Sequence, residues 1–137
     1  MSSVVIHTDG GARGNPGPAA AAAVVSQNGT VIAEVRKYLG DSCTNNFAEY
    51  QGLALGLMET QRLGLTQEPI EVRMDSELVV KQMRGQYKVK DAALKVEHAT
   101  VRALLQQFAN VRFTHVPREQ NKEADKLVNE AIDAASR

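Results

Sequence analysis

The first third of the chain is a series of short apolar segments separated by turn-forming residues. Residues 4–9 are a β-branched run closed by two glycines, and residues 31–39 alternate apolar with polar side chains, two patterns typical of β-strands. Another apolar segment, residues 19–26, precedes Asn28-Gly29, a dipeptide typical of hairpin turns. The pattern therefore predicts an antiparallel meander of three strands.

After this meander, apolar positions recur at steps of three and four residues. Helices are predicted at residues 46–64, 76–83, 91–109 and 122–135, the last with Asn121 as its N-cap, and strands at residues 70–75 and 111–116. Because a crossover helix separates the third strand from the fourth, the sheet must be mixed and covered by helices. We therefore predict an α/β fold of three layers, with helices on both faces of a five-stranded mixed sheet in which parallel strands follow the antiparallel meander.

The composition is that of one globular domain. The chain has 137 residues, 43% of them hydrophobic and 23% charged, and no internal repeat, so we predict a single domain over residues 1–137. Its one cysteine, Cys43, excludes an internal disulfide framework and a zinc site built from several thiolates. There is no N-terminal signal segment and no apolar run near the roughly 20 residues of a membrane span. We therefore expect a cytoplasmic protein without membrane contact.

Four carboxylates lie at junctions between the predicted strands and helices. Asp9 and Asp75 end strands, and Glu49 and Asp125 lie in the first turns of helices. In α/β proteins, functional groups gather at strand ends and at the helix starts beside them. Each acid taken alone also has a structural explanation, as a turn residue, a helix cap, a capping-box glutamate or a partner of the helix dipole.

As a group, the four acids indicate a metal-dependent reaction. Two carboxylates about 4 Å apart repel each other by about 4 kcal/mol at an effective dielectric constant of about 20. A fold that brings several together must keep some protonated or bind cations, and oxygen ligands alone favour Mg²⁺ or Mn²⁺ over zinc or copper. Two such ions about 3.5–4 Å apart activate water and stabilise the leaving oxygen of a phosphodiester.

Four motifs, in order along nearly the whole chain, resemble the type 1 ribonuclease H family. They are Thr8-Asp9-Gly10-Gly11 with Gly14-Asn15-Pro16-Gly17-Pro18, then Thr44-Asn45-Asn46-Phe47-Ala48-Glu49, then Asp75-Ser76, and finally His115-Val116-Pro117-Arg118-Glu119-Gln120-Asn121 with Ala124-Asp125. The resemblance implies a ribonuclease H-like fold, and an endoribonuclease that hydrolyses the RNA strand of RNA–DNA hybrids to leave 5′-phosphate and 3′-hydroxyl ends. It also implies that Asp9, Glu49, Asp75 and Asp125 are catalytic and hold two Mg²⁺ or Mn²⁺ ions when substrate is bound. We expect a monomer.

Two residues compete for a role in proton transfer or product release. In the family, the residue ten positions before the last acid is often a mobile histidine, which here is His115. By strand parity, however, His115 shares a face with Val111 and Phe113, so it could instead be partly buried. Arg118, in the following loop, is the alternative, and both side chains could pair with phosphate.

The resemblance also implies a set of substrate-binding residues. RNA is distinguished from DNA through its 2′-hydroxyl groups, which backbone groups and small polar side chains can contact. Thr44 resembles a threonine that grips a phosphate of the DNA strand, but it could equally cap a helix. The matching positions are Gly10, Gly11, Asn15, Thr44, Asn45 and Asn46.

The chain departs from the family pattern beyond the third acid. Glu77 stands where the family often has a glutamine that contacts the minor groove, and the Trp-rich basic protrusion of some members is missing. The shorter segment in its place is still locally basic, through Arg84, Lys88, Lys90 and Lys95. It is either a site of backbone contact or a solvated turn.

The net charge bears on the choice among the alternatives. With 16 Lys and Arg against 16 Asp and Glu, the chain is neutral, which by itself argues against a nucleic-acid partner. If four acids bind cations, however, 16 basic residues face the remaining 12 acids, a formal charge of +4. The leading hypothesis is therefore a ribonuclease H. The alternatives are cleavage of double-stranded RNA by the same site, a non-catalytic nucleic-acid-binding domain, and a small-molecule phosphatase, for which no pocket motif is evident.

Overall fold

The computed structural model describes residues 3–136, and within them five strands form one sheet. The strands are β1 (Val4–Ala12), β2 (Gly17–Gln27), β3 (Thr30–Cys43), β4 (Pro69–Met74) and β5 (Asn110–His115). The helices are α1 (Asn45–Arg62), α2 (Glu77–Met83), α3 (Ala92–Leu105), the 3-10 helix η1 (Arg118–Gln120) and α4 (Lys122–Ala135). Their order is the predicted one, with the addition of η1, which the apolar periodicity does not predict.

The sheet is mixed, as predicted. Its strand order is β3-β2-β1-β4-β5, with β1, β2 and β3 antiparallel and with β4 parallel to both β1 and β5. In the register of the central pair, Thr8 of β1 lies opposite Met74 of β4. The next residues along the two strands are Asp9 and Asp75, so this register brings the two acids side by side.

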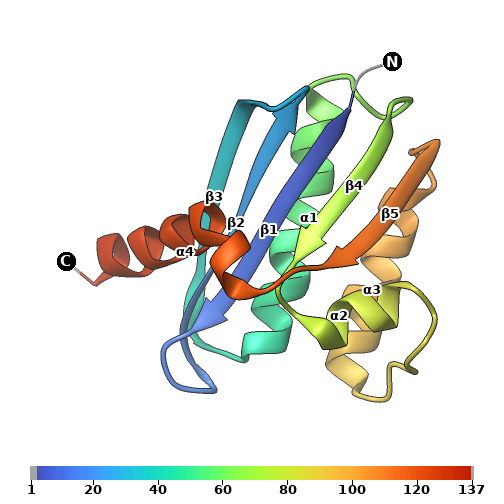
Figure 1. Ribbon diagram of the computed structural model, residues 1–137. Helices are drawn as coiled ribbons and strands as arrows, with labels where there is room; N and C mark the ends of the chain where they lie inside the picture. The colour runs from blue at the N-terminus through green and yellow to red at the C-terminus, as the bar shows by residue number, and fades with distance from the viewer. Residues whose placement is uncertain (1–2, 137) are drawn as a thin grey trace.

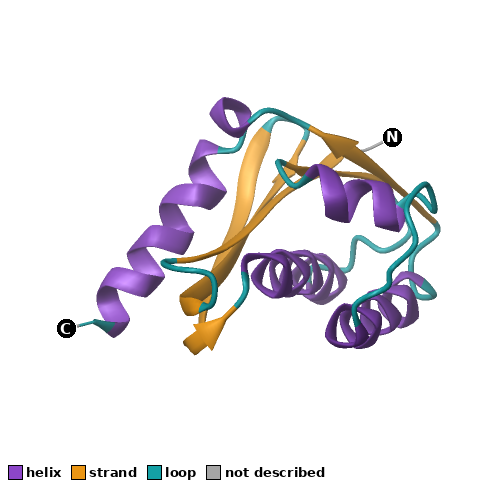
Figure 2. Cartoon of the chain, turned by 90° about the horizontal axis from the view of Figure 1, so that it is seen from below, coloured by secondary structure: helices purple, strands orange, loops and turns teal. Residues whose placement is uncertain are grey.

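Helices cover both faces of the sheet and give three layers (Figures 1 and 2). Helix α1 packs on β1 and β2 and also against α3, whereas α4 packs on β2, β3 and the end of β1 across the sheet. The predicted α/β fold of three layers is therefore confirmed. None of the helices within residues 3–136 has the length and apolar character needed to cross a membrane.

Small side chains in β2 allow helices to approach both faces. Residues 19–23 are five consecutive alanines, all fully buried. On one side, Tyr50, Leu53 and Leu57 of α1 pack in the main core with residues of β1 and β4. On the other, Ala20 and Ala22 pack against α4 in a second, smaller cluster. Burial of each large apolar side chain contributes about 1.5–3 kcal/mol, so the two clusters fix α1 and α4 against the sheet.

Three element boundaries differ from the sequence prediction by three residues or more, for reasons of tertiary structure. Strand β1 continues to Ala12, beyond the predicted end at Asp9, because it stays paired with β2 up to Ala19. Strand β3 continues to Cys43, beyond the predicted end at residue 39, because it stays paired with β2 through register shifts up to Gly17. Helix α3 ends at Leu105 rather than at residue 109. Ala109 donates its N–H to the carbonyl of Thr66 at 3.0 Å instead, and this bond leads the chain into β5.

Candidate active site

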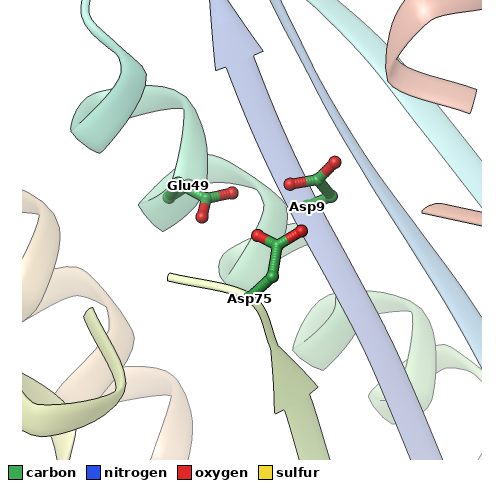
Figure 3. A group of neighbouring side chains, drawn as sticks. All are labelled: Asp9, Glu49 and Asp75. Carbon is green, nitrogen blue, oxygen red and sulfur yellow. The ribbon is translucent and has the colours of Figure 1, made fainter. Parts of the chain in front are cut away.

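Three of the four predicted acids converge at the ends of neighbouring elements. Asp9 lies near the end of β1, Glu49 in the second turn of α1, and Asp75 directly after β4, and the three side chains point toward one another (Figure 3). Each offers a carboxylate oxygen within 4.8 Å of those of the other two. The structure thus brings together three acids from three separate elements, although Asp9 and Asp75 are 66 positions apart in the sequence.

Glu49 reaches the sheet because α1 and β1 approach each other closely at two glycines. A Cβ atom on Gly10 would lie 2.0 Å from the carbonyl oxygen of Ala48, and one on Gly52 would lie 2.3 Å from the carbonyl oxygen of Asp9. At this separation the Glu49 carboxylate accepts the N–H of Gly10 at 2.5 Å. Backbone contact between helix and strand therefore sets the distance between Glu49 and Asp9.

The capping-box explanation of Glu49 is wrong. The N-cap of α1 is Thr44, whose hydroxyl accepts the N–H of Phe47 at 3.2 Å, so Glu49 lies two positions beyond the capping-box position. Similarly, Ser76 caps α2 through the N–H of Val79, so Asp75 does not cap a helix. Helix capping thus does not account for these two acids, whose side chains face the cluster instead.

Burial and mutual repulsion favour protonated acids in this cluster. Burial is the main cause that raises the pKa of Asp9 to about 7, and the charges of Asp75 and Asp125 add to it, whereas hydrogen bonds with Glu49 and Gly10 oppose it. Burial and the neighbouring Asp9 raise the pKa of Glu49 well above its usual value. Burial also raises the pKa of Asp75, against the opposing effects of Asn121, Arg118 and His115.

Asp125 belongs to the same cavity but stands apart from the three clustered acids. It lies in the first turn of α4, and its charge raises the pKa values of both Asp9 and Asp75. The cavity, of about 420 Å³, is bounded by the ends of β1 and β4, by the first two turns of α1 and by the first three turns of α4. The residues that line it are Asp9, Gly10, Gly11, Ala12, Arg13, Asn45, Asn46, Glu49, Asp75, Ser76, Arg118, Asp125, Val128, Asn129 and Ile132.

Most of the predicted substrate-binding residues lie at this cavity. Gly10, Gly11, Asn45 and Asn46 line it. Asn15 does not, but its side chain accepts the N–H of Asn45 at 3.0 Å, and the side chain of Asn45 accepts the N–H of Ala12 at 2.8 Å. These bonds connect the turn after β1 to the start of α1. Thr44 lies outside the lining and acts as the helix cap described above.

The two candidates for the proton or product-release step differ in position. Arg118, in η1, lines the cavity. His115, the last residue of β5, is exposed, so the alternative of a partly buried histidine is wrong, and it does not contribute to the lining. Both charges lower the pKa of Asp75, with Arg118 the stronger of the two.

The sequence did not predict the roles of two residues whose side chains join separate elements around the cavity. Arg13 lines it, and its guanidinium pairs with Asp133 at 2.6 Å and donates to Asn129 at 3.2 Å, which ties the turn after β1 to α4. Asn121, predicted as a cap, is buried and donates its amide N–H to the carbonyl of Thr8 at 2.8 Å. No sequence signal reveals either contact, since the partners of Arg13 and Asn121 lie more than 100 positions away.

The donor set fits a hard divalent cation. The clustered ligand atoms are all carboxylate oxygens, the ligands that Mg²⁺ and Mn²⁺ prefer, and no thiolate or imidazole belongs to the group. Asp9 and Glu49 are only 6% and 7% exposed, so solvent does little to screen their charges. A bound cation would replace the protons that these acids hold in its absence.

Comparison with known proteins identifies the family. Residues 7–131 match a family model described as reverse transcriptase-like. The chain is 46% identical to LC11-RNase H1, a protein isolated from compost, and the two folds superpose with a TM-score of 0.93 over 98% of this chain and 99% of that one. That structure is of LC11-RNase H1 in complex with an RNA/DNA hybrid. The chain belongs to the type 1 ribonuclease H family.

Other members of this enzyme family are longer than the chain. A protein of Halobacterium salinarum named ribonuclease HI is 44% identical over 130 residues, which are 94% of this chain and 64% of that protein. The bifunctional protein Rv2228c of Mycobacterium tuberculosis is 47% identical over 135 residues, but the chain spans only 36% of its length. The N-terminal ribonuclease H domain of Rv2228c, solved as a fusion protein, superposes with a TM-score of 0.92 at 46% identity, over 99% of this chain and 97% of that one. The family resemblance read from the four motifs is therefore confirmed.

Proposed function

We propose that this chain is a metal-dependent endoribonuclease, with residues 1–137 as one catalytic domain. It hydrolyses the RNA strand of RNA–DNA hybrids and leaves 5′-phosphate and 3′-hydroxyl ends. The observation that carries the proposal is the cluster of Asp9, Glu49 and Asp75, with carboxylate oxygens within 4.8 Å of one another in a cavity that Asp125 also lines. The fold shared with a ribonuclease H1 in complex with an RNA/DNA hybrid supports the choice of substrate.

In this proposal the four acids hold two Mg²⁺ or Mn²⁺ ions. The chemistry that the bound cations supply is activation of water and stabilisation of the leaving 3′-oxygen. Arg118 lies where it can pair with a phosphate of the RNA strand, and His115 is the alternative for the proton or product-release step. Gly10, Gly11, Asn45 and Asn46 face the substrate, and Asn15 supports them through its bond to Asn45.

A broader substrate range is the second candidate. Double-stranded RNA presents 2′-hydroxyl groups in a wide, shallow minor groove, and a site that reads shape accepts more than one duplex. Glu77, in the first turn of α2, replaces a side chain that could have contacted the groove, so fewer specific contacts are available there. A non-catalytic binding domain is disfavoured, because concentrated carboxylates repel phosphate unless cations are bound.

One cleavage assay tests the proposal. End-labelled RNA–DNA hybrid, double-stranded RNA and single-stranded RNA are incubated with the protein and Mg²⁺, Mn²⁺ or a chelator. We expect metal-dependent cleavage of the hybrid, and products whose 5′ ends require phosphatase treatment before a kinase can label them. The Asp75→Asn variant should lose about 1,000-fold or more in kcat/KM, the scale of losing a principal catalytic group.

Glu123→Gln is the matched control for the acids. Glu123 is an exposed acid in the first turn of α4, two residues before Asp125, and does not line the cavity. Its variant should keep wild-type activity. Absence of metal-dependent hybrid cleavage in the wild type would reject the proposed activity, whereas equal activity of Asp75→Asn and wild type would reject the site.

A further inference from the structure

Asn121 is a buried polar residue at a position where asparagine ordinarily caps a helix. It lies between η1 and α4 and is only 1% exposed. An N-cap asparagine normally accepts a hydrogen bond from the second or third N–H of its helix. The side chain of Asn121 makes no such bond to α4. Its amide is therefore available for contacts outside the helix.

Side-chain and backbone contacts of Asn121 together connect four parts of the candidate site. The side-chain N–H of Asn121 donates at 2.8 Å to the carbonyl of Thr8, which belongs to the peptide that joins Thr8 to Asp9. The side chain also lowers the pKa of the Asp75 carboxyl group, in the direction expected of a nearby amide donor. Its backbone carbonyl accepts the N–H of Asp125 at 3.1 Å, and its backbone N–H donates to the carbonyl of Arg118 at 2.9 Å.

The acids need such a connection because they lie on separate elements. The pairing of β1 with β4 places Asp9 and Asp75, but Asp125 is on α4, which no strand pairing joins to either of them. Their charges repel one another, and repulsion would separate elements that are free to move. Asn121 contacts all three regions at once, and its neutral amide adds no further negative charge to the cluster.

The side-chain oxygen of Asn121 supports a role beyond packing. Within residues 3–136 this buried atom has no hydrogen-bond partner. An unpartnered buried polar atom destabilises the fold, and an apolar residue of similar size would avoid that cost. Packing alone thus does not explain an asparagine at this position.

We infer that Asn121 is a positioning residue that holds Asp9, Asp75 and Asp125 in the arrangement that binds divalent cations. The inference rests on the proposed metal-dependent function, since it concerns the same site. It assigns to Asn121 no contact with substrate or with the cation. Its effect passes through the carboxylates that it holds.

The test measures Mn²⁺ binding to the metal-free protein directly, by titration calorimetry. Asn121→Leu removes the amide with little change in volume, and Asn121→Ser removes it with a smaller side chain. We expect both variants to bind Mn²⁺ about 10–100-fold more weakly than wild type, the usual effect of losing a group that orients metal ligands. Binding is measured at a temperature at which circular dichroism shows each variant to be folded.

Gln82→Leu is the matched control. Gln82 is also a buried amide, 5% exposed, and its side chain accepts a hydrogen bond from the Tyr50 hydroxyl at 2.6 Å, away from the acids. This variant also removes a buried side-chain amide, but it should keep wild-type affinity for Mn²⁺. Equal Mn²⁺ affinity of folded Asn121→Leu, Asn121→Ser and wild type would overturn the inference and leave Asn121 as a structural residue.

The two proposals fail in different ways. Wild-type protein that binds Mn²⁺ more tightly than the Asn121 variants, but does not cleave the hybrid, overturns the proposed function and supports the inference. Wild-type protein that cleaves the hybrid, with Asn121 variants of unchanged Mn²⁺ affinity, supports the proposed function and overturns the inference.

Discussion

At the scale of single residues, burial distinguishes two of the four acids of the candidate site from the rest. The chain has 16 acidic residues, yet Asp9 and Glu49 are the two that are buried among residues 3–136. The same burial that concentrates their charge for a cation makes the metal-free site unfavourable, because the carboxylates must hold protons or repel one another. The candidate site therefore gains its affinity for cations at the expense of fold stability.

This opposition predicts a pH dependence of stability in the metal-free protein. The pKa of Asp9 is raised from 3.8 to about 7 in the fold, so the folded protein binds this proton more tightly than the unfolded chain does. The stabilisation is complete at pH below the unfolded value and is lost as pH rises toward about 7. We expect the free energy of unfolding, measured with urea and a chelator, to fall by a few kcal/mol between pH 5 and pH 8.

Asp9→Asn is the control for this titration. Burial lowers the pKa values of His7 and His98, so these residues act in the opposite direction as pH rises. Subtracting the pH profile of Asp9→Asn isolates the carboxyl contribution. Mn²⁺ should restore the stability of wild type at pH 8, since a ligand that binds only the folded state stabilises it. Parallel profiles for wild type and Asp9→Asn would contradict the prediction.

A second residue-scale prediction separates Arg118 from His115. Because Arg118 lines the cavity and His115 does not, we expect Arg118→Ala to lower kcat for hybrid cleavage about 100-fold, the lower end of the range for a group that takes part in proton transfer. His115→Ala should have a smaller effect. Steady-state kinetics at fixed Mg²⁺ provide the comparison, and a larger loss of kcat in His115→Ala would assign the step to the histidine instead.

At the scale of elements, the close approach of α1 to β1 sets the site. Gly52 faces the carbonyl oxygen of Asp9 and Gly56, one turn later, faces the side chains of Ile6 and Thr8. Gly52→Ala forces the helix away from the backbone at Asp9 and so separates Glu49 from Asp9. We expect a loss of about 1–3 kcal/mol in stability, typical of overpacking, together with a loss of hybrid cleavage.

Gly56→Ala is the comparison for Gly52→Ala. A Cβ atom there would meet side-chain carbons at 2.7 Å or more, which can shift, rather than backbone at 2.3 Å. It should therefore destabilise the protein while retaining more activity, as urea unfolding and the cleavage assay can measure. If both variants lost stability and activity in the same proportion, the distance between α1 and β1 would have no special role in the site.

The order of the strands and helices is the feature of the structure that the sequence predicted best. The order of strands and helices follows from periods of two and of three to four residues, because each element buries one face in the core. The positions of Asp9, Glu49 and Asp75 at junctions follow from the same pattern. The contacts of Arg13 with Asp133 could not be predicted, since a residue pair 120 positions apart meets only through packing of α4 on the sheet.

At the scale of the whole molecule, the arrangement of charge matters more than its sum. The chain is neutral overall, but four of its acids lie at one cavity, and the connection between α2 and α3 carries Lys88 and Lys90. These lysines line a separate hollow with Tyr87, and Lys81 lies 5.0 Å from the centre of the tyrosine ring. A neutral protein can thus present lysines to phosphates at a place separate from the cavity that the four acids line.

The charge arrangement predicts that the salt dependence of hybrid binding is set by lysines at particular positions and not by the net charge of the protein. Each phosphate contact contributes about −0.9 to the slope of log K against log salt concentration for a B-form duplex, because binding releases condensed cations. Fluorescence anisotropy with labelled hybrid and the Asp75→Asn variant, which should bind without cleaving, gives this slope. Adding Lys88→Gln should reduce its magnitude by about one phosphate contact.

Lys37→Gln, at an exposed lysine of the edge strand β3, removes the same charge from the other side of the sheet and should leave the slope unchanged. Equal changes in the two variants would mean that net charge, rather than the position of Lys88, governs binding.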